Sequence, residues 1–377
     1  MTAEGAIEFE ALEAQAASLM NLFGKAGYER VAPAFIQPAS LFLDRIGEQL
    51  RARTYVFTDP NGDELCLRPE MTIPVCRIFL ERGNGSANAK FCYNGPAFRI
   101  QEGKPDPLRP REFRQAGIEF FGEAGEAADL EAASLIIEAV RQSGVKSFSI
   151  KVGHIGLFTA LLHALPMPER WRHRLAHAFW RPNVFAEELA ALSRPHDGQP
   201  LPLSVAGLTP DGFLKFLEAR QIPFIGLRRP DEIVKRLANK AADAGETPLS
   251  NETVSTIEHY LHIKGPLAHS FEDIESLFAK GGLELGEALG NTRSLFESLK
   301  RPAEAAPIVF DASFGHHFEY YTGMVFQIES EGRGIAGEIA GGGRYDGLIR
   351  ALSGGSHDVP AVGAAIHTER LLAAARE

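Results

Sequence analysis

The sequence lacks the features that mark membrane and secreted proteins. None of its apolar runs reaches the roughly 20 residues that a membrane-spanning helix needs. The N-terminal stretch from Met1 to Phe9 has neither the basic start nor the apolar core of a secretory signal. We therefore expect a cytoplasmic protein with no membrane role.

Cysteine and net positive charge are also scarce. Cys66, Cys76 and Cys92 form neither a Cys-x-x-Cys pair nor a zinc-ligand spacing, which argues against a disulfide framework or a thiolate metal site. His173 and His177 have an i, i+4 spacing that zinc enzymes use, but no glutamate base accompanies them, so we expect no metal. The formal net charge of −10 argues against non-specific nucleic-acid binding, which depends on neutralising many phosphates.

The composition is that of a globular protein, with 45% hydrophobic and 23% charged residues, and the length of 377 residues suggests two or three domains. Strand-like and helix-like patterns alternate in residues 1–155 and 302–377, where we expect a sheet domain. Between them, residues 156–301 read as a mostly helical insertion, in which Thr209 and Ser250 are typical N-caps.

The stretch from residue 306 to residue 345 combines a strand-like pattern with many aromatic and glycine residues. Apolar alternation from Tyr320 to Ile328 predicts a strand with large side chains on both faces, typical of a strand inside a sheet. Tyr320 and Tyr321 would then place a phenol on each face, near a glycine-rich turn at residues 341–347. An ordinary core strand and hairpin explains this stretch, taken alone, equally well.

Two earlier segments carry polar side chains that suit a pocket. Glu70 and Thr72 lie at the predicted N-terminus of an apolar helix, where the helix dipole stabilises a carboxylate. Glu70 either caps this helix only or faces a cavity and holds a cationic group. Further along, Gln115, Gly117 and Glu119 share one face of a predicted strand, and a polar face of this kind favours a pocket floor.

Four arginines flank a long polar loop between two predicted strands. They are Arg99, Arg109, Arg111 and Arg114. Guanidinium groups gathered at one opening suit a planar anion, because arginine donates two parallel hydrogen bonds to a carboxylate or phosphate. A run of charges is, however, more often a solvated face.

Taken together, these stretches resemble the class II aminoacyl-tRNA synthetase catalytic fold, and specifically the histidyl-tRNA synthetase family. Residues 27–38, 98–121 and 362–372 are similar to the three motifs of that class, the first of which forms dimers. Residues 67–72, 319–321 and 341–348 resemble histidine-recognition motifs. The resemblance covers about residues 10–155 and 305–377. It implies an α+β fold with an antiparallel sheet flanked by helices.

The resemblance also implies two groups of site residues. The implied histidine pocket is lined by Glu70, Thr72, Gln115, Glu119, Tyr320 and Tyr321. Its carboxylates offer acceptors to an α-ammonium or an imidazole N–H, and a tyrosine hydroxyl can complete the hydrogen bonds of the imidazole. The candidate anion or nucleotide contacts are Arg99, Arg109, Arg111 and Arg370.

Three departures from the synthetase pattern bear on catalysis. The arginine that assists adenylate formation in the synthetases is replaced here by His316, followed by His317, and a largely neutral imidazole cannot stand in for a permanent cation beside phosphate. Gln101 occupies the place of a motif glutamate, although Glu102 follows it. Only residues 371–377 follow Arg370, so we expect no anticodon-binding domain and no tRNA.

A synthetase-like body with these departures resembles the regulatory subunit of ATP phosphoribosyltransferase (the HisZ type), a histidyl-tRNA synthetase paralogue. The resemblance implies a non-catalytic chain without a cofactor that assembles, as a homodimer within a larger hetero-oligomer, with a short-form catalytic subunit at the first step of histidine biosynthesis. It further implies feedback inhibition by L-histidine, acting either in the synthetase-like pocket or at an interface. The alternatives are a truncated enzyme that activates histidine with ATP and a scaffold with a vestigial pocket.

Overall fold

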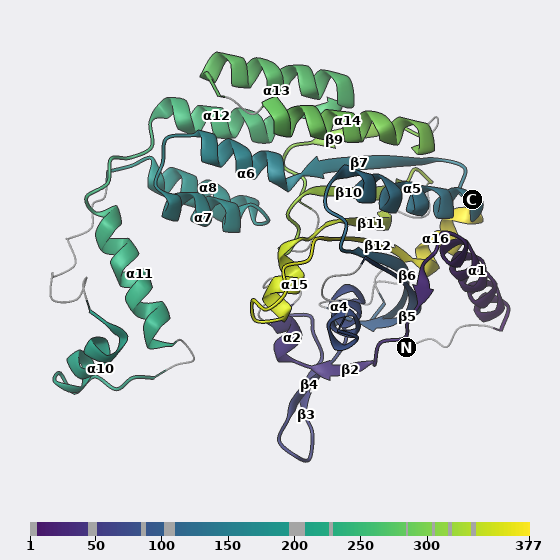
Figure 1. The fold of residues 1–377 in the computed structure, drawn as a ribbon, viewed down its shortest axis with the longest axis horizontal. Coiled ribbons are helices and arrows are strands. Elements are labelled where there is room, and N and C mark those ends of the chain that lie inside the picture. Colours follow the sequence, from purple (N-terminus) through teal and green to yellow (C-terminus); the bar gives the residue numbers. More distant parts are fainter. Residues whose placement is uncertain are drawn as a thin grey trace. The chain divides into compact units, whose positions relative to one another are not determined.

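The computed structural model describes residues 6–43, 51–83, 88–101, 110–195, 208–225, 229–283, 286–303, 306–315, 319–332 and 337–377 (Figure 1). The chain forms two compact units, one comprising Met1–Ala164 and Glu258–Glu377 and the other Leu165–Ile257. The domain limits read from the sequence, at 155/156 and 301/302, stay a prediction. Within the described ranges, no helix is long and apolar enough to cross a bilayer.

A nine-stranded sheet organises the first unit, in the order β1-β5-β6-β12-β11-β10-β7-β9-β8. The pairs β1–β5 and β7–β9 are parallel, and the other neighbours are antiparallel. In sheet order the strands span β1 (Glu29–Arg30), β5 (Ala89–Phe98), β6 (Glu112–Phe121), β12 (Ala361–His367), β11 (Glu338–Arg344), β10 (Met324–Ser330), β7 (Phe148–His154), β9 (Ile308–Asp311) and β8 (Lys264–Pro266). A mostly antiparallel sheet with β10 in its interior is what the sequence predicts.

The two faces of this sheet differ in character, because successive side chains on a strand point to opposite faces. One face is apolar, with Ile118 of β6, Ile366 of β12 and Phe326 of β10 fully buried. Helix α5 (Glu126–Gln142) contacts β6, β10, β11 and β12, and α14 (Gly286–Ala303) packs against α5. The polar face carries Gln115 and Glu119 on β6, in register with Gly363 and His367 of β12.

Other elements of the first unit surround the sheet. Helix α1 (Ala6–Lys25) packs on β5, β6 and α16 (Thr368–Ala375), and its apolar stripe of Leu12, Ala16, Leu19 and Phe23 is buried. Strands β3 (Val56–Thr58) and β4 (Glu64–Leu67) pair with each other and, together with β2 (Ile36–Pro38), make a small three-stranded sheet. The remaining helices are α2 (Ser40–Leu43), α4 (Thr72–Glu81), α6 (Ile155–Ala164), α12 (Asn251–His262), α13 (Leu267–Gly281) and α15 (Gly347–Leu352).

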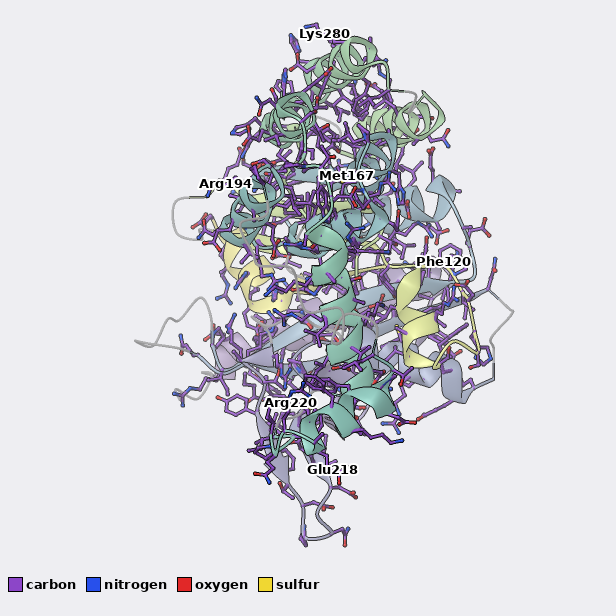
Figure 2. The ribbon with its side chains drawn as sticks, turned by 90° about the vertical axis from the view of Figure 1, so that its left-hand side faces the viewer. Phe120, Met167, Arg194, Glu218, Arg220 and Lys280 are labelled. Atoms are coloured by element: carbon purple, nitrogen blue, oxygen red, sulfur yellow. The ribbon has the colours of Figure 1, made fainter. Side chains whose placement is uncertain are left out.

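The second unit consists of helices α7 (Glu169–Ala178), α8 (Pro182–Leu192), α10 (Pro210–Glu218) and α11 (Pro230–Asp243), together with the start of α12. Asp243 is buried and accepts hydrogen bonds from the Arg170 and Trp171 side chains, both at 2.6 Å. The predicted Thr209 cap accepts the Gly212 N–H at 3.1 Å. Figure 2 labels Glu218 and Arg220 at the end of α10.

Two details of the predicted 320–345 region are wrong. Strand β10 begins at Met324, so Tyr320 and Tyr321 precede it, and their rings lie 5.0 Å apart rather than on opposite faces. The glycines from Gly341 to Gly343 lie inside β11 instead of in a turn. A Cβ on Gly343 would overlap the Met324 carbonyl oxygen, so close approach of neighbouring backbone, not turn geometry, explains glycine there.

Arg344, in the Gly-Gly-Gly-Arg-Tyr-Asp segment, links α5 to the sheet through hydrogen bonds. Arg344 is 6% exposed, and its Nε donates to Asp129 Oδ1 at 2.7 Å. Its Nη1 donates to Asp346 at 2.9 Å and its Nη2 to the Gly125 carbonyl at 2.7 Å. Burial raises the pKa of Asp129 to about 6, although Arg344 opposes that shift. Arg344 therefore lies on the apolar side of the sheet, away from the polar face.

We expect Arg344→Ala to lower the free energy of unfolding by about 3–5 kcal/mol, because it leaves the buried Asp129 carboxylate without its cation. Chemical denaturation measures the loss. Arg350→Ala is the matched control, since Arg350 and Asp358 form a 3.5 Å pair whose side chains are 66% and 73% exposed. That control should change stability by less than about 1 kcal/mol. Equal effects of the two substitutions would contradict the assignment.

Candidate functional site

Glycines on the polar face make room for large side chains above the sheet. On β6, Gly117 stands between Gln115 and Glu119, and a Cβ on Gly117 would come within 2.5 Å of the Tyr93 hydroxyl. On β12, Gly363 pairs with Glu119, and a Cβ there would overlap Glu119 Oε2. The alternating glycines therefore form a floor on which a carboxylate and a phenol can lie flat.

Glu119 is the most deeply buried carboxyl of this floor. It is 0% exposed, the Tyr93 hydroxyl donates to Oε1 at 3.2 Å, and the Tyr345 hydroxyl donates to Oε2. Burial raises the pKa of Glu119 to about 8, and the Glu70 carboxyl adds to the rise. Hydrogen bonds from Tyr345, Thr72 and Tyr93 oppose the shift in pKa. A carboxyl with this pKa carries its proton through most of the neutral range.

Glu70 caps α4, as one of the two sequence interpretations holds. Its Oε2 accepts the Thr72 N–H at 2.6 Å, and its Oε1 accepts the Ile73 N–H at 2.9 Å. Burial raises the pKa of Glu70, while these hydrogen bonds and the nearby Arg99 oppose the rise. Each carboxylate oxygen has a second lone pair, so capping leaves Glu70 able to accept from a ligand as well.

Thr72 and the tyrosines complete the cluster around the two carboxyls. Burial raises the pKa values of Glu70, Glu119 and Tyr320, and hydrogen bonding to the Thr72 side chain opposes each shift. The Tyr320 ring lies 5.7 Å from the Tyr345 ring in an edge arrangement. The hydroxyl of Thr72 is thus shared among polar groups that come from three separate segments of the chain.

Gln115 presents an unsatisfied acceptor on the same face. Its side chain is 4% exposed, and its Oε1 has no hydrogen-bond partner within the described part of the chain. A buried acceptor left unpaired costs about 1–3 kcal/mol, so such a position favours a partner supplied by a ligand or water. The structure thus brings the predicted pocket residues Glu70, Thr72, Gln115, Glu119, Tyr320 and Tyr321 to one side of the sheet.

Two of the candidate anion contacts lie near Glu338. Burial and the nearby Arg53 lower the pKa of Arg99 to about 10, and the Glu338 and Glu70 carboxyls oppose that shift. The Arg99 Nε donates to the Pro69 carbonyl at 2.8 Å. Arg370 donates through Nη1 to the Glu338 carbonyl at 2.8 Å. These two arginines, distant in sequence, therefore approach the same strand end.

The other predicted cations are placed differently. Arg114 donates to Glu13 of α1 at 2.5 Å, so its guanidinium pairs with this helix. Its neighbour Gln115 faces the pocket, and strand alternation turns Arg114 to the opposite face. Arg111 has an exposed side chain. Arg109 and His316 lie outside the described residues, so their predicted roles stay predictions.

The structure adds residues to the pocket that the sequence does not single out individually. Tyr345 lies in the 341–348 segment that resembles a histidine-recognition motif, and period-two alternation from Gly343 at the end of β11 places it on the pocket face. Tyr93 lies two residues after Phe91 on β5, and this period-two spacing indicates that both side chains lie on one face of the strand. The Cys76 thiol is fully buried, and burial together with Glu119 raises its pKa. Arg68 is 1% exposed and donates hydrogen bonds to the carbonyls of two prolines distant in sequence. The burial of Arg68 could not be predicted from local sequence, because these partners lie far along the chain.

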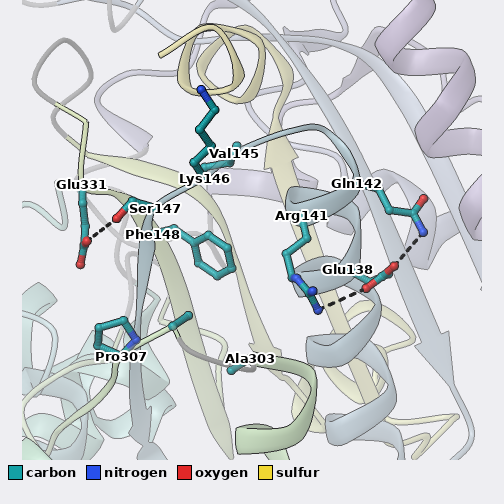
Figure 3. Close-up of a pocket in the computed structure, with 11 residues that line it drawn as sticks. Glu138, Arg141, Gln142, Val145, Lys146, Ser147, Phe148, Ala303, Pro307 and Glu331 are labelled. Atoms are coloured by element: carbon teal, nitrogen blue, oxygen red, sulfur yellow. Dashed lines mark hydrogen bonds and ion pairs between the residues drawn. The ribbon is translucent and has the colours of Figure 1, made fainter.

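A separate hollow of about 660 Å³ lies where the end of α5 and the start of β7 meet the residues after α14 (Figure 3). Its polar side chains largely pair with one another. Gln142 donates to Glu138 at 2.7 Å, and the Ser147 hydroxyl donates to Glu331 at 2.5 Å. None of the predicted site residues lines this hollow.

Comparisons with known proteins cover nearly the whole chain. The family model described as "Histidyl-tRNA synthetase" matches residues 6–208 and 228–371. A protein of Mesorhizobium japonicum named "ATP phosphoribosyltransferase regulatory subunit" is 36% identical over 373 residues, covering 94% of this chain and 96% of the relative. A relative of the same name from Brucella anthropi is 34% identical over 355 residues, covering 91% and 92%.

Solved structures share the fold. The crystal structure of an ATP phosphoribosyltransferase regulatory subunit/histidyl-tRNA synthetase from Bacillus halodurans has a TM-score of 0.69 at 21% identity, covering 99% of this chain and 81% of that one. A histidyl-tRNA synthetase from Nostoc has a TM-score of 0.63 at 16% identity, covering 97% and 72%. The predicted α+β class II synthetase-like fold is confirmed. The sequence identity and coverage of the relatives go further: the chain belongs to the family of ATP phosphoribosyltransferase regulatory subunits.

Proposed function

We propose that this chain is a non-catalytic, histidine-sensing subunit that works with a short-form ATP phosphoribosyltransferase catalytic subunit at the first step of histidine biosynthesis and mediates feedback inhibition by L-histidine. The unpaired acceptor of buried Gln115, on the same sheet face as Glu119, carries the sensing part. The names of the relatives support the catalytic partner.

The chemistry of the pocket complements histidine. The ligand offers three α-ammonium donors and an imidazole N–H, while the pocket offers the acceptors of Glu70, Gln115 and Glu119. Arg99 and Arg370 bring positive charge toward Glu338, at the strand end where an α-carboxylate could be held. Donors and acceptors thus match in kind, and the buried setting strengthens each hydrogen bond relative to water.

The non-catalytic part rests on the substitution of His316 for a permanent cation. Transfer of an adenylyl group develops charge on phosphate, and a largely neutral imidazole stabilises it poorly. A histidine-activating enzyme is the second candidate, because Arg99 and Arg370, which resemble arginines that hold ATP in synthetases, lie close to one strand end. Pyrophosphate exchange separates these two candidates.

We further propose a homodimer within the hetero-oligomer, formed through an apolar patch on the small three-stranded sheet. The patch consists of Ile36 of β2 and Phe57 of β3, which are 52% and 38% exposed and share one face of the small sheet with half-buried Leu65 and Leu67 of β4. Clustered exposed apolar side chains favour an interaction site. Ile36 also falls within the 27–38 segment that resembles a dimer-forming motif, which supports a second copy of the chain as the occupant.

Titration calorimetry should detect L-histidine binding that Gln115→Ala weakens. Because the substitution removes the acceptor, we expect a loss of about 1–3 kcal/mol in binding free energy, at least about fivefold in Kd. Gln142→Ala, which changes a glutamine in the separate hollow, serves as the control and should bind as the unaltered protein does. Undiminished binding by Gln115→Ala would count against the proposed pocket.

Co-purification with a short-form catalytic subunit tests the regulatory role. We expect a stable complex whose phosphoribosyltransferase activity exceeds that of the catalytic subunit alone and falls when L-histidine is added. The isolated chain should show no histidine-dependent exchange between pyrophosphate and ATP. Failure to form a complex would remove the regulatory proposal, and appreciable exchange would favour the enzyme instead.

Ile36→Lys and Phe57→Lys should dissociate the homodimer, because each places a charge in the apolar patch. Sedimentation equilibrium of the isolated chain should show a rise in Kd of at least about tenfold for each, corresponding to about 1.4 kcal/mol. Ile225→Lys is the matched control, since Ile225 is 84% exposed in the second unit and outside the patch. A monomeric unaltered chain, or dissociation by the control alone, would refute this interface.

A further inference from the structure

We propose that Glu119 carries a proton in the ligand-free pocket and releases it to solvent when L-histidine binds, so that histidine sensing is graded by pH. The inference rests on the proposed function, because it concerns how the same pocket responds to the same ligand. It goes beyond the proposed function because it includes a proton in the binding reaction, whereas the proposed function concerns only which residues line the pocket.

The geometry isolates the Glu119 carboxyl from water and from cations. The side chain is 0% exposed, and each of its oxygens meets a phenol, Tyr93 on one and Tyr345 on the other. Gly363 closes on Oε2 from the neighbouring strand. Phenol hydroxyls donate hydrogen bonds but do not neutralise a charge, so an ionised Glu119 would have no counter-charge at contact distance among these partners.

Groups from several elements act on this carboxyl. The strongest influences on the pKa of Glu119 are its burial, the hydrogen bonds from Tyr345, Thr72 and Tyr93, and the second carboxyl of Glu70. The titratable groups facing Glu119 are Glu70 and Cys76 around the start of α4, Tyr93 of β5, Tyr28 before β1, Tyr321 and Tyr320 before β10, and Tyr345 after β11. Every one of these groups is neutral or acidic.

The two carboxyls of the pocket are not equivalent. Glu70 accepts hydrogen bonds from two backbone N–H groups at the start of α4, and the nearby Arg99 opposes the rise in the pKa of Glu70. Glu119 has neither a helix terminus nor an arginine among its strongest influences, and its pKa is about 8. When two carboxyls share a buried site, the less stabilised one keeps its proton. That one is Glu119.

Histidine brings the missing counter-charge. Its α-ammonium is a full cation at neutral pH, and a cation within about 4–6 Å favours the ionised form of a carboxyl. Above about pH 7 the free imidazole is mostly neutral, so binding there need not take up a proton on the ring. A protonated carboxyl and an ammonium ion thus become a carboxylate–ammonium pair and one released proton.

The signs follow from linkage. Binding that releases a proton strengthens as pH rises, up to the pKa of the free Glu119 at about 8, and then levels off. Without ligand, the raised pKa means that the protonated carboxyl stabilises the fold at low pH. That contribution is complete below the unfolded pKa of about 4.3 and is lost as pH rises through about 8.

Titration calorimetry with L-histidine between about pH 7 and pH 8.5, in paired buffers of different ionisation heat, tests the proposal. We expect affinity to rise by up to about tenfold per pH unit below about pH 8, with buffer-dependent heat showing release of close to one proton at about pH 7 and less as pH rises through about 8. Glu119→Gln should bind more weakly, without pH dependence or buffer-dependent heat. Glu138→Gln, on the separate hollow, should keep the behaviour of the unaltered protein.

The outcomes separate the two proposals. If L-histidine binds with an affinity independent of pH and a heat independent of buffer, proton release is refuted and histidine sensing still holds. Transfer of the proton to the bound imidazole would give that result. Absence of histidine binding at every pH, alone or with the catalytic subunit, overturns both. If Glu119→Gln does not fold, the paired-buffer heats of the unaltered protein still decide the matter.

Discussion

The burial of the Glu119 carboxyl against glycines of adjacent strands is the constraint on which the pocket depends. Gly117 and Gly363 leave space above the sheet, and Tyr93 and Tyr345 use that space to reach the carboxyl from two sides. A side chain at either glycine would push a polar group out of the floor. The same burial that shapes the pocket also raises the pKa of the carboxyl to about 8, so pocket geometry and the shift in pKa have one physical cause.

Strand alternation divides structural from ligand-facing roles within single motifs. Arg344 and Tyr345 are neighbours in sequence, yet Arg344 anchors α5 through Asp129 on the apolar face, whereas Tyr345 bonds Glu119 on the polar face. Arg114 and its neighbour Gln115 are separated in the same way. A motif that resembles a ligand-recognition sequence thus divides its side chains between the apolar and the polar face of the sheet. Substitutions within it should therefore be interpreted residue by residue.

Much of the site could be read from residue type and spacing. Period-two alternation grouped Gln115 with Glu119, and the position of Glu70 before an apolar helix predicted its cap. The orientation of Tyr320 and Tyr321 could not be read, because it depends on where β10 begins. Glycines within a strand and glycines in a turn also look alike in a sequence. Only the neighbouring backbone against Gly343 distinguishes them.

The sequence by itself determined the order of motifs along the chain and the identity of the polar residues, because these depend on local periodicity and side-chain chemistry. Its resemblance to the synthetases implied the α+β class. Tertiary structure decided which of those residues meet. Glu70, Glu119 and Tyr345 come from segments far apart in the chain, and their encounter depends on strand order and register. The raised pKa of Glu119 likewise arises only in three dimensions, since desolvation is a property of the assembled pocket.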